Sequence, residues 1–233
     1  AHQDVAVCCV PNAGRIYPYY VKSMWMRTPK GLFCALYGAS ELNTEVNGVN
    51  VHITEQTNYP FDLTISFLID VSQPVEFELA FRKPAWAIGF EVQNESEWQE
   101  ENGVIKIYKI WKAGDKLVLN FQAKVMTNQF IQDEHFISYG PLVFARPLNG
   151  QAKEGRTYPV EGLRDLYYSL DDSASSFDLP TMGEKDLHLE QQPFHAENPW
   201  ETLSITTSSK SSPKLLPMGS SILRQITFRQ LNK

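Results

Sequence analysis

The run Val49-Asn50-Val51-His52-Ile53-Thr54 decides the fold class, because apolar and polar side chains alternate strictly along it. A period of two is typical of a strand that buries one face and exposes the other to water. Asn47-Gly48 comes directly before this run. That pair favours a two-residue hairpin turn, since both turn positions require positive φ. The stretch therefore predicts an antiparallel hairpin.

The same alternation recurs at residues 63–67, 75–81 and 117–123. Residues 112–115 predict another turn, and Pro60 and Pro74 stand at strand entrances. Short strands separated by turns about ten residues apart, with hardly a helix among them, are typical of sandwiches. We therefore predict an all-β chain that forms an antiparallel β-sandwich, either one large sandwich or two small ones.

The first thirty residues differ from this pattern and predict a short helix from Asn12 to about Met26, ended by residues 28–31. Pro18 lies inside that span, so the helix either starts later or kinks. A single helix cannot bury its apolar side chains alone. It needs a partner, either the following domain or another one.

The region from about 150 to 199 lacks sustained periodicity and predicts a long irregular excursion. Residues 206–213 form a second polar connector, and residues 202–205 and 221–228 predict strands, the last of which closes the sheet. We therefore divide the chain into a terminal helical segment, 1–30, and a β-sandwich region, 31–233.

Composition excludes several classes of protein. The net charge of −6 argues against nucleic acid or an anionic membrane as the main partner. No stretch approaches the ~18 apolar residues of a membrane span. The chain has no signal peptide and no initiating Met, so we expect a soluble piece of a longer protein that is periplasmic or cytoplasmic.

Two of the three cysteines, Cys8 and Cys9, are adjacent. Neighbouring Cα atoms lie ~3.8 Å apart, which is below the usual span of a disulfide, so the pair stays available as thiolates. Such thiolates suit zinc, which needs three or four ligands. Cys34 lies in an apolar run and is expected to be a buried small hydrophobe.

The rest of the chain offers few partners for a metal or for glycoside hydrolysis. His2 is nearest to the cysteine pair, and His52 falls on the polar face of its strand. Paired carboxylates are the usual hydrolytic groups. Glu76 and Glu78 share a solvent-facing side of a strand, and the acidic run 95–101 predicts a soluble loop. Three tryptophans could form a sugar platform or pack in the core: Trp86, Trp98 and Trp111.

The segment Cys8-Cys9-Val10-Pro11-Asn12, followed by Arg15, resembles the Cys-Cys-Pro-Pro-Asn segment of the β-L-arabinofuranosidase family of glycoside hydrolases, family 127. Further runs fit the same family in order along the chain: MWMRTP at 24–29, LYGASE at 36–41, RKPAW at 82–86, WKAGD at 111–115, GPLVFA at 140–145 and PMGSSILR at 217–224. Val10 stands where the family has proline.

This resemblance implies an N-terminal (α/α)6 barrel with the catalytic site, followed by β-sandwich domains. By the same resemblance, Cys8 is the nucleophile and a zinc ligand, and Cys9 is a zinc ligand. A barrel glutamate and a further barrel cysteine complete the metal site, and another barrel glutamate is the acid/base. A zinc-bound Cys8 thiolate could attack an anomeric carbon without a general base.

In this interpretation the chain begins where the barrel ends, so its helix is the last piece of the barrel, repacked on the sandwich. We expect a non-catalytic fragment that supports the barrel of a retaining glycoside hydrolase, is inactive alone, and holds no zinc. Its expected partners are the barrel of the same parent chain and, in the parent, a glycan, with homo-oligomerisation left open. The alternatives are a carbohydrate-binding module, which would expose a coplanar row of tryptophans, and a purely structural domain.

Overall fold

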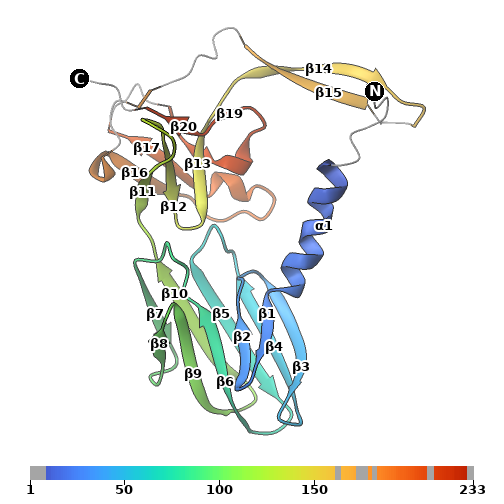
Figure 1. Ribbon diagram of the computed structural model, residues 1–233, viewed down its shortest axis with the longest axis vertical. Helices are drawn as coiled ribbons and strands as arrows, with labels where there is room; N and C mark the ends of the chain where they lie inside the picture. Colours follow the sequence, from blue (N-terminus) through green and yellow to red (C-terminus); the bar gives the residue numbers. More distant parts are fainter. Residues whose placement is uncertain (1–8, 161–163, 172–177, 180–182, 209–212, 230–233) are drawn as a thin grey trace. The chain divides into compact units, whose positions relative to one another are not determined.

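The computed structural model describes residues 9–160, 164–171, 178–179, 183–208 and 213–229. The chain divides into two compact units, residues 1–123 and 124–233. The first unit contains helix α1 (Cys9–Lys22) and two sheets, and the second contains further strands and its own core (Figure 1).

Two five-stranded sheets form the sandwich of the first unit (Figure 1). One sheet has the order β1 (Trp25–Thr28), β2 (Gly31–Cys34), β6 (Val75–Arg82), β9 (Val104–Trp111) and β8 (Gln99–Glu101). The other has the order β3 (Ser40–Val46), β4 (Val49–Thr57), β5 (Thr64–Val71), β10 (Asp115–Gln122) and β7 (Gly89–Gln93).

The predicted alternation matches the burial along these strands. In β4, Val49, Val51 and Ile53 are buried, and Asn50 is exposed. The same inward series continues on β5, whose Ile65, Phe67, Ile69 and Val71 are buried. Burial of each branched or aromatic side chain stabilises the fold by roughly 1.5–3 kcal/mol. The prediction of an all-β sandwich with a short N-terminal helix is confirmed.

The turns also follow the sequence. Asn47 and Gly48 have φ of 51° and 78°, and they join β3 to β4 as predicted. One pair of strands departs from the antiparallel pattern, because β2 runs parallel to β6. The chain leaves β2 for the other sheet and returns only in β6. At the start of β2, a Cβ on Gly31 would lie 2.1 Å from the carbonyl oxygen of Glu78, so this pairing requires glycine.

The helix ends earlier than predicted. α1 spans Cys9–Lys22, so Asn12 lies inside it and does not cap it, and Pro18 is accommodated within it. Residues 25–28 form β1 and pair with β2, so the predicted helical end near Met26 is wrong. The backbone groups of β1 bond across a hairpin to β2, which a continued helix would forbid.

The second unit has a six-stranded sheet and two smaller ones. The six strands are β11 (Val125–Gln129), β12 (His135–Tyr139), β13 (Leu142–Pro147), β18 (Leu216–Pro217), β19 (Arg224–Gln225) and β20 (Thr227–Phe228). The predicted final strand at 221–228 is therefore two short pieces, which pair with β13 and β12. Short 3-10 turns occur at Glu184–Asp186, Pro199–Glu201 and Met218–Ser220.

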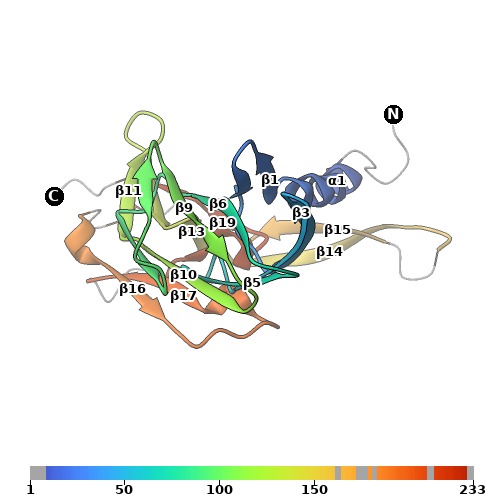
Figure 2. The same ribbon diagram turned by 90° about the horizontal axis from the view of Figure 1, so that it is seen from below.

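The remaining strands of this unit fall largely where an irregular excursion was expected. β14 (Gly150–Thr157) and β15 (Arg164–Leu170) form an antiparallel hairpin (Figure 2), and β16 (Leu187–Gln191) pairs with β17 (Leu203–Thr207). Little regular structure was predicted between 150 and 199, and for β14, β15 and β16 that was wrong, whereas β17 overlaps the strand predicted at 202–205. The residues of β14 are all exposed, so the hairpin carries no buried/exposed alternation that sequence could reveal.

Candidate functional site

Of the two adjacent cysteines singled out by sequence, only Cys9 lies within the described residues. Cys8 lies outside them, and Cys9 is the first residue of helix α1. The described residues contain no group of three or more His, Cys, Asp or Glu side chains placed to hold a metal ion. They therefore offer no zinc site to test the cysteines against. The roles of Cys8 as nucleophile and of both cysteines as metal ligands stay predictions.

Helix α1 exposes most of its apolar side chains. Ile16, Tyr17, Tyr19 and Val21 are each between 61% and 70% exposed. The expectation that the helix repacks on the sandwich is wrong for these side chains. An apolar helix surface of this kind is typical of a segment that docks against a partner.

The C-terminal end of α1 is nevertheless attached to the sandwich. The Tyr20 hydroxyl donates to the carbonyl oxygen of Tyr37 at 2.9 Å. Just beyond the helix, the carbonyl oxygen of Met24 accepts from the backbone N–H of Ala35 at 2.8 Å and of Leu36 at 3.4 Å. The segment 35–40, which connects β2 to β3 and includes the first residue of β3, is therefore the point at which the helix end is held.

A buried carboxyl group fastens that same segment. Glu55 on β4 is 2% exposed. Its Oε1 accepts from the backbone N–H of Gly38 at 3.0 Å, and its Oε2 accepts from the Ser40 hydroxyl at 3.0 Å. Burial raises the pKa of Glu55 from the ordinary 4.5 to about 7, against the opposing effect of these two hydrogen bonds.

Other titratable side chains surround this carboxyl group. Tyr37 is buried and donates its hydroxyl to the carbonyl oxygen of Arg82 at 2.5 Å. Burial raises the pKa of Cys34 and Tyr37 well above their usual ranges and that of Tyr59 to about 12. Cys34 is fully buried as predicted, with its thiol 3.6 Å from the carbonyl oxygen of Leu36. The cluster therefore favours uncharged forms.

The candidate hydrolytic carboxylates lie elsewhere. Glu76 is exposed on β6 and Glu78 is half-buried on the same face, which is the solvent-facing side as predicted. Glutamates of the acidic run 95–101 form ion pairs, Glu100 with Lys83 and Glu101 with Lys106. These contacts are typical of a solvated surface.

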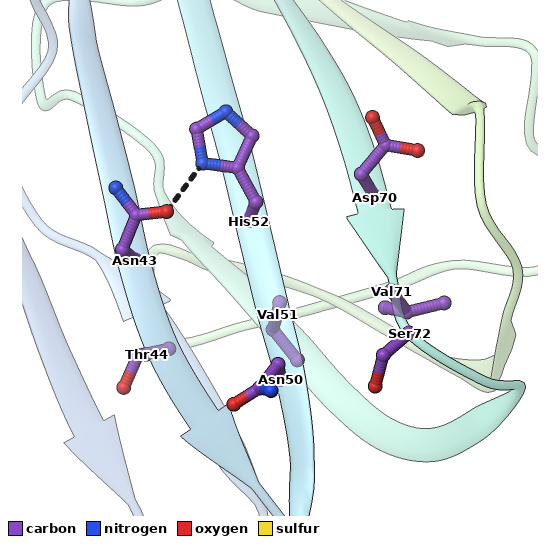
Figure 3. Close-up of a pocket in the computed structure, with 8 residues that line it drawn as sticks. All are labelled: Asn43, Thr44, Asn50, Val51, His52, Asp70, Val71 and Ser72. Carbon is purple, nitrogen blue, oxygen red and sulfur yellow. Dashed lines mark hydrogen bonds between the residues drawn. The ribbon is translucent and has the colours of Figure 1, made fainter.

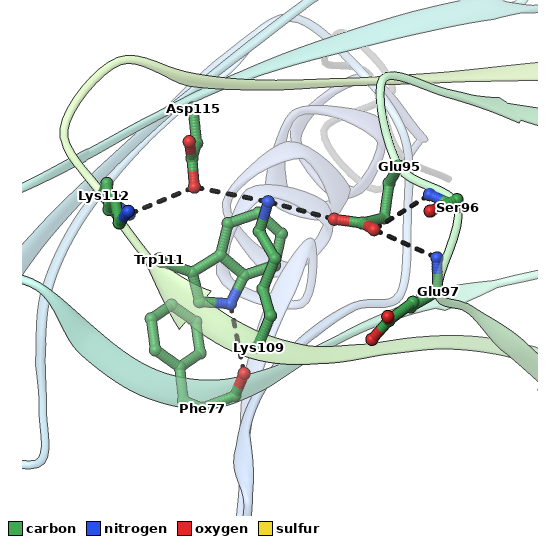
Figure 4. Close-up of polar contacts among 8 residues, drawn as sticks. All are labelled: Phe77, Glu95, Ser96, Glu97, Lys109, Trp111, Lys112 and Asp115. Carbon is green, nitrogen blue, oxygen red and sulfur yellow. Dashed lines mark hydrogen bonds and ion pairs between the residues drawn. The ribbon is translucent and has the colours of Figure 1, made fainter.

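Lys109 joins the acidic loop to the sandwich (Figure 4). Its ammonium group lies 3.0 Å from Glu95 and 3.4 Å from Asp115, and 4.6 Å from the ring centroid of Trp111. Partial burial lowers the pKa of Lys109, but the two carboxylates outweigh that effect and raise it above its usual range. Beneath it, the Trp111 indole donates to the carbonyl oxygen of Phe77 at 3.1 Å. We call these contacts of Lys109 with Glu95, Asp115 and Trp111 the surface brace.

The three tryptophans do not form a row. Trp111 is 1% exposed, and Trp86 is half-buried with its ring edge-on to Phe121. Trp98 is 39% exposed and packs edge-on against Phe90. A flat sugar platform needs coplanar exposed rings, so the arrangement of these three favours packing roles.

A polar hollow of about 520 Å³ lies on the outer face of β3, β4 and β5 (Figure 3). Asn43, His52 and Asp70 are direct neighbours across these three strands. Nδ1 of His52 lies 2.7 Å from Oδ1 of Asn43, and Asp70 accepts from the backbone N–H of Gly114 at 3.0 Å. His52 thus lies on the polar face, as its alternation predicted.

Sequence reasoning did not identify Glu55, Tyr20 or Tyr37. The sequence did contain an indication of Glu55. It is the next alternate position after Val51 and Ile53, so the alternation places its carboxyl group on the core face. Nothing in the sequence pairs Tyr20 with Tyr37, because that contact depends on where the chain returns after the β1–β2 hairpin.

Residues 31–123 match the family described as β-L-arabinofuranosidase, GH127 middle domain. This part of the chain is therefore similar to the middle domain of that family. The match covers most of the first unit, including the whole sandwich from β2 onward. The resemblance inferred from the sequence motifs is therefore confirmed.

Solved structures share the fold of the whole chain. Over 97% of its length it is similar to a GH127 β-L-arabinofuranosidase from Geobacillus stearothermophilus T6, with a TM-score of 0.62 and 21% identity. A protein described as a glycoside hydrolase is similar over 97% of the chain, with a TM-score of 0.61 and 17% identity. A GH127 β-arabinofuranosidase is similar over the same share, with a TM-score of 0.58 and 14% identity.

The chain spans 38%, 40% and 39% of the lengths of these three proteins, so it corresponds to less than half of each. No curated protein sequence matches it. Within the described part of the chain, no helix is both long enough and apolar enough to cross a membrane.

Proposed function

We propose that the chain is the non-catalytic β-sandwich portion of a retaining glycoside hydrolase that acts on β-L-arabinofuranosides, and that it supports a helical catalytic barrel. The observation that carries this proposal is helix α1. It exposes Ile16, Tyr17, Tyr19 and Val21 while its end leads directly into the region similar to the GH127 middle domain. An apolar helix surface beside a well-packed sandwich is what a docked catalytic domain would cover.

The chemistry assigned to the cysteines follows from the family resemblance. Cys8 would act as the thiolate nucleophile at the anomeric carbon, and Cys8 and Cys9 would supply two ligands to zinc, with the other ligands and the acid/base from the barrel. Thiolate formation is the chemistry that a bound zinc ion would support. In this proposal no described residue of the sandwich carries out a catalytic step.

The test compares the 233-residue chain with a chain extended through the coding sequence upstream of Ala1. We expect only the extended chain to hydrolyse an aryl β-L-arabinofuranoside. Within it, Cys8→Ala should lower turnover by about 10³-fold or more, as loss of a nucleophile does. Cys34→Ala, which removes the buried thiol, is the matched control and should keep turnover. Equal activity of the short chain, or full activity of Cys8→Ala, would contradict the proposal.

A second candidate function, saccharide binding, rests on the polar hollow in Figure 3. Amide, imidazole and carboxylate groups such as those of Asn43, His52 and Asp70 are the groups that bind sugar hydroxyls. Isothermal titration with arabinose oligosaccharides tests it. Binding that Asp70→Ala abolishes and Glu41→Ala preserves would favour this candidate, and absence of heat at millimolar sugar would remove it.

A further inference from the structure

Glu55 breaks the pattern of its own strand. It continues the inward series of β4, and it is 2% exposed, as Ile53 and Val51 are 0% and 2% exposed. Carboxyl groups are rarely buried to this extent unless they are paired with a cation. Its two partners, Gly38 N–H and the Ser40 hydroxyl, are neutral donors. A group that costs stability in this place is a candidate for a specific role.

Both partners belong to the segment that holds the end of α1. Gly38 and Ser40 flank the turn into β3, and Tyr37 precedes them. The Tyr37 carbonyl oxygen accepts the Tyr20 hydroxyl from the helix, and the Tyr37 hydroxyl donates to Arg82 of β6. The contacts form a continuous chain from Glu55 through the segment 37–40 to Tyr20.

The surroundings disfavour a negative charge on Glu55. Tyr20 of α1, Cys34 of β2, Tyr37 and Tyr59 are the titratable groups that act on one another around it, and each has a raised pKa. Arg82, which acts on Tyr20, Cys34, Tyr37 and Tyr59, is exposed. The cost of burying an ionised Glu55 carboxylate is therefore removed chiefly when the segment 35–40 opens to water.

We propose that Glu55 is a positioning residue, a proton-dependent clasp that holds the 37–40 segment and, through Tyr20, the C-terminal end of α1. With its proton, the carboxyl group stays buried and the helix end is held. On loss of the proton, the segment opens locally to hydrate the carboxylate, and the hold on the helix end weakens. The clasp does not rest on the proposed function, because it involves only described residues of α1 and the first unit.

Hydrogen–deuterium exchange of the full 233-residue chain tests the clasp. In the native chain, protection of amides in 17–24 and 35–40, corrected for intrinsic exchange, should fall by up to about tenfold per pH unit as the pH rises from about 4.5 to about 7, and should level off above that. Amides of β12 and β13 should keep their protection over the same range.

Three variants sharpen the test. Glu55→Gln keeps an acceptor for Gly38 N–H and offers a donor to Ser40, so protection should become independent of pH. Glu41→Gln, an exposed glutamate on the adjacent strand, should behave as the native chain. Tyr20→Phe should lower protection of the helix end by about threefold to tenfold while the 35–40 segment stays protected.

The clasp is overturned if Glu55→Gln keeps the native pH dependence, if native protection does not change with pH, or if Tyr20→Phe leaves the helix end unaffected. Should Glu55→Gln fail to fold, carbon-detected titration of the Glu55 carboxyl in the native chain still decides, since ionisation in the ordinary glutamate range overturns the proposal. None of these measurements uses enzymatic activity. An inactive extended chain would contradict the proposed function and leave the clasp standing.

Discussion

The two units of the chain solve the same packing problem differently. The first buries its apolar side chains on long strands such as β4, β5 and β6, each of eight or nine residues. The second gathers its core from short, distant pieces, including Val125, Leu179 and Phe228. Among the described residues, the first unit has more than twice as many buried apolar side chains.

The difference shows what a strand pattern can specify. A long alternating strand states its own inward face, so β4 and β6 determine how two full sheets stack. A strand of two residues, such as β19 or β20, has no period to repeat, and its place depends on the strands it meets. The second unit should therefore depend more heavily on each of its buried side chains.

The largest expected effect comes from emptying each core in turn. Phe67→Ala removes a ring that is 1% exposed and lies 4.8 Å from that of Phe81, and Phe144→Ala removes one that is fully buried in the second unit. Each should cost about 3–5 kcal/mol within its own unit. Because its core is smaller, the second unit should unfold with Phe144→Ala, whereas the first should remain folded with Phe67→Ala.

Urea titration followed by hydrogen exchange of peptides from each unit measures this. Tyr108→Ala, an exposed aromatic on β9, is the control and should change little. If either core substitution destabilises both units equally, the cores are not independent and the comparison between them is broken.

The next effect belongs to the first unit alone and depends on pH. The pKa of Glu55 is raised from 4.5 to about 7 in the folded chain, so the folded state binds the proton more tightly than the unfolded state. Stability is therefore lost as pH rises from about 4.5 through about 7, by about 3 kcal/mol in total. Glu55→Gln should match the native chain near pH 4.5 and exceed it in stability at pH 8, as measured by urea unfolding. Equal pH dependence of both chains would contradict this.

Much of the fold of the first unit could be predicted from sequence. The alternation at 49–54 and 75–79 matched buried faces, although Ala80 on the predicted outer face is buried too, and Asn47-Gly48 matched a turn. The helix end near Met26 could not be located, because the backbone of β1 is satisfied only by pairing with β2. The parallel pairing of β2 with β6 depends equally on a contact between distant segments.

The site was less accessible to sequence. Motifs predicted a site at Cys8 and Cys9, and the described residues contain no cluster of three or more His, Cys, Asp or Glu side chains that could hold a metal ion. Glu55 was detectable as a carboxyl group on an inward position, but only when the alternation is followed past Thr54. The link from Glu55 to Tyr20 requires three separate segments to meet, which no local pattern records.

Turn glycines should matter equally in both units. Gly48 and Gly140, at the β3–β4 and β12–β13 turns, have φ of 78° and 55°. Alanine at either position should cost about 1 kcal/mol, because L side chains disfavour positive φ. Gly14→Ala, in α1 with open space around its Cβ position, is the control and should be neutral or stabilising. Urea unfolding measures both costs. If the Gly48 and Gly140 substitutions differ in cost, the costlier turn, and not the core of its unit, determines the register of the strands there.

The smallest expected effect tests whether the surface of the first unit contributes as its core does. Lys109→Met removes the ammonium group shared by Glu95, Asp115 and the Trp111 ring, and keeps the apolar stem that covers the indole. Since the lysine is partly exposed, the loss should be about 0.5–1 kcal/mol, and smaller in high salt. Urea unfolding at low and high ionic strength measures it. A loss as large as that of Phe67→Ala would mean that this brace, and not the alternating core, holds β9 to β10.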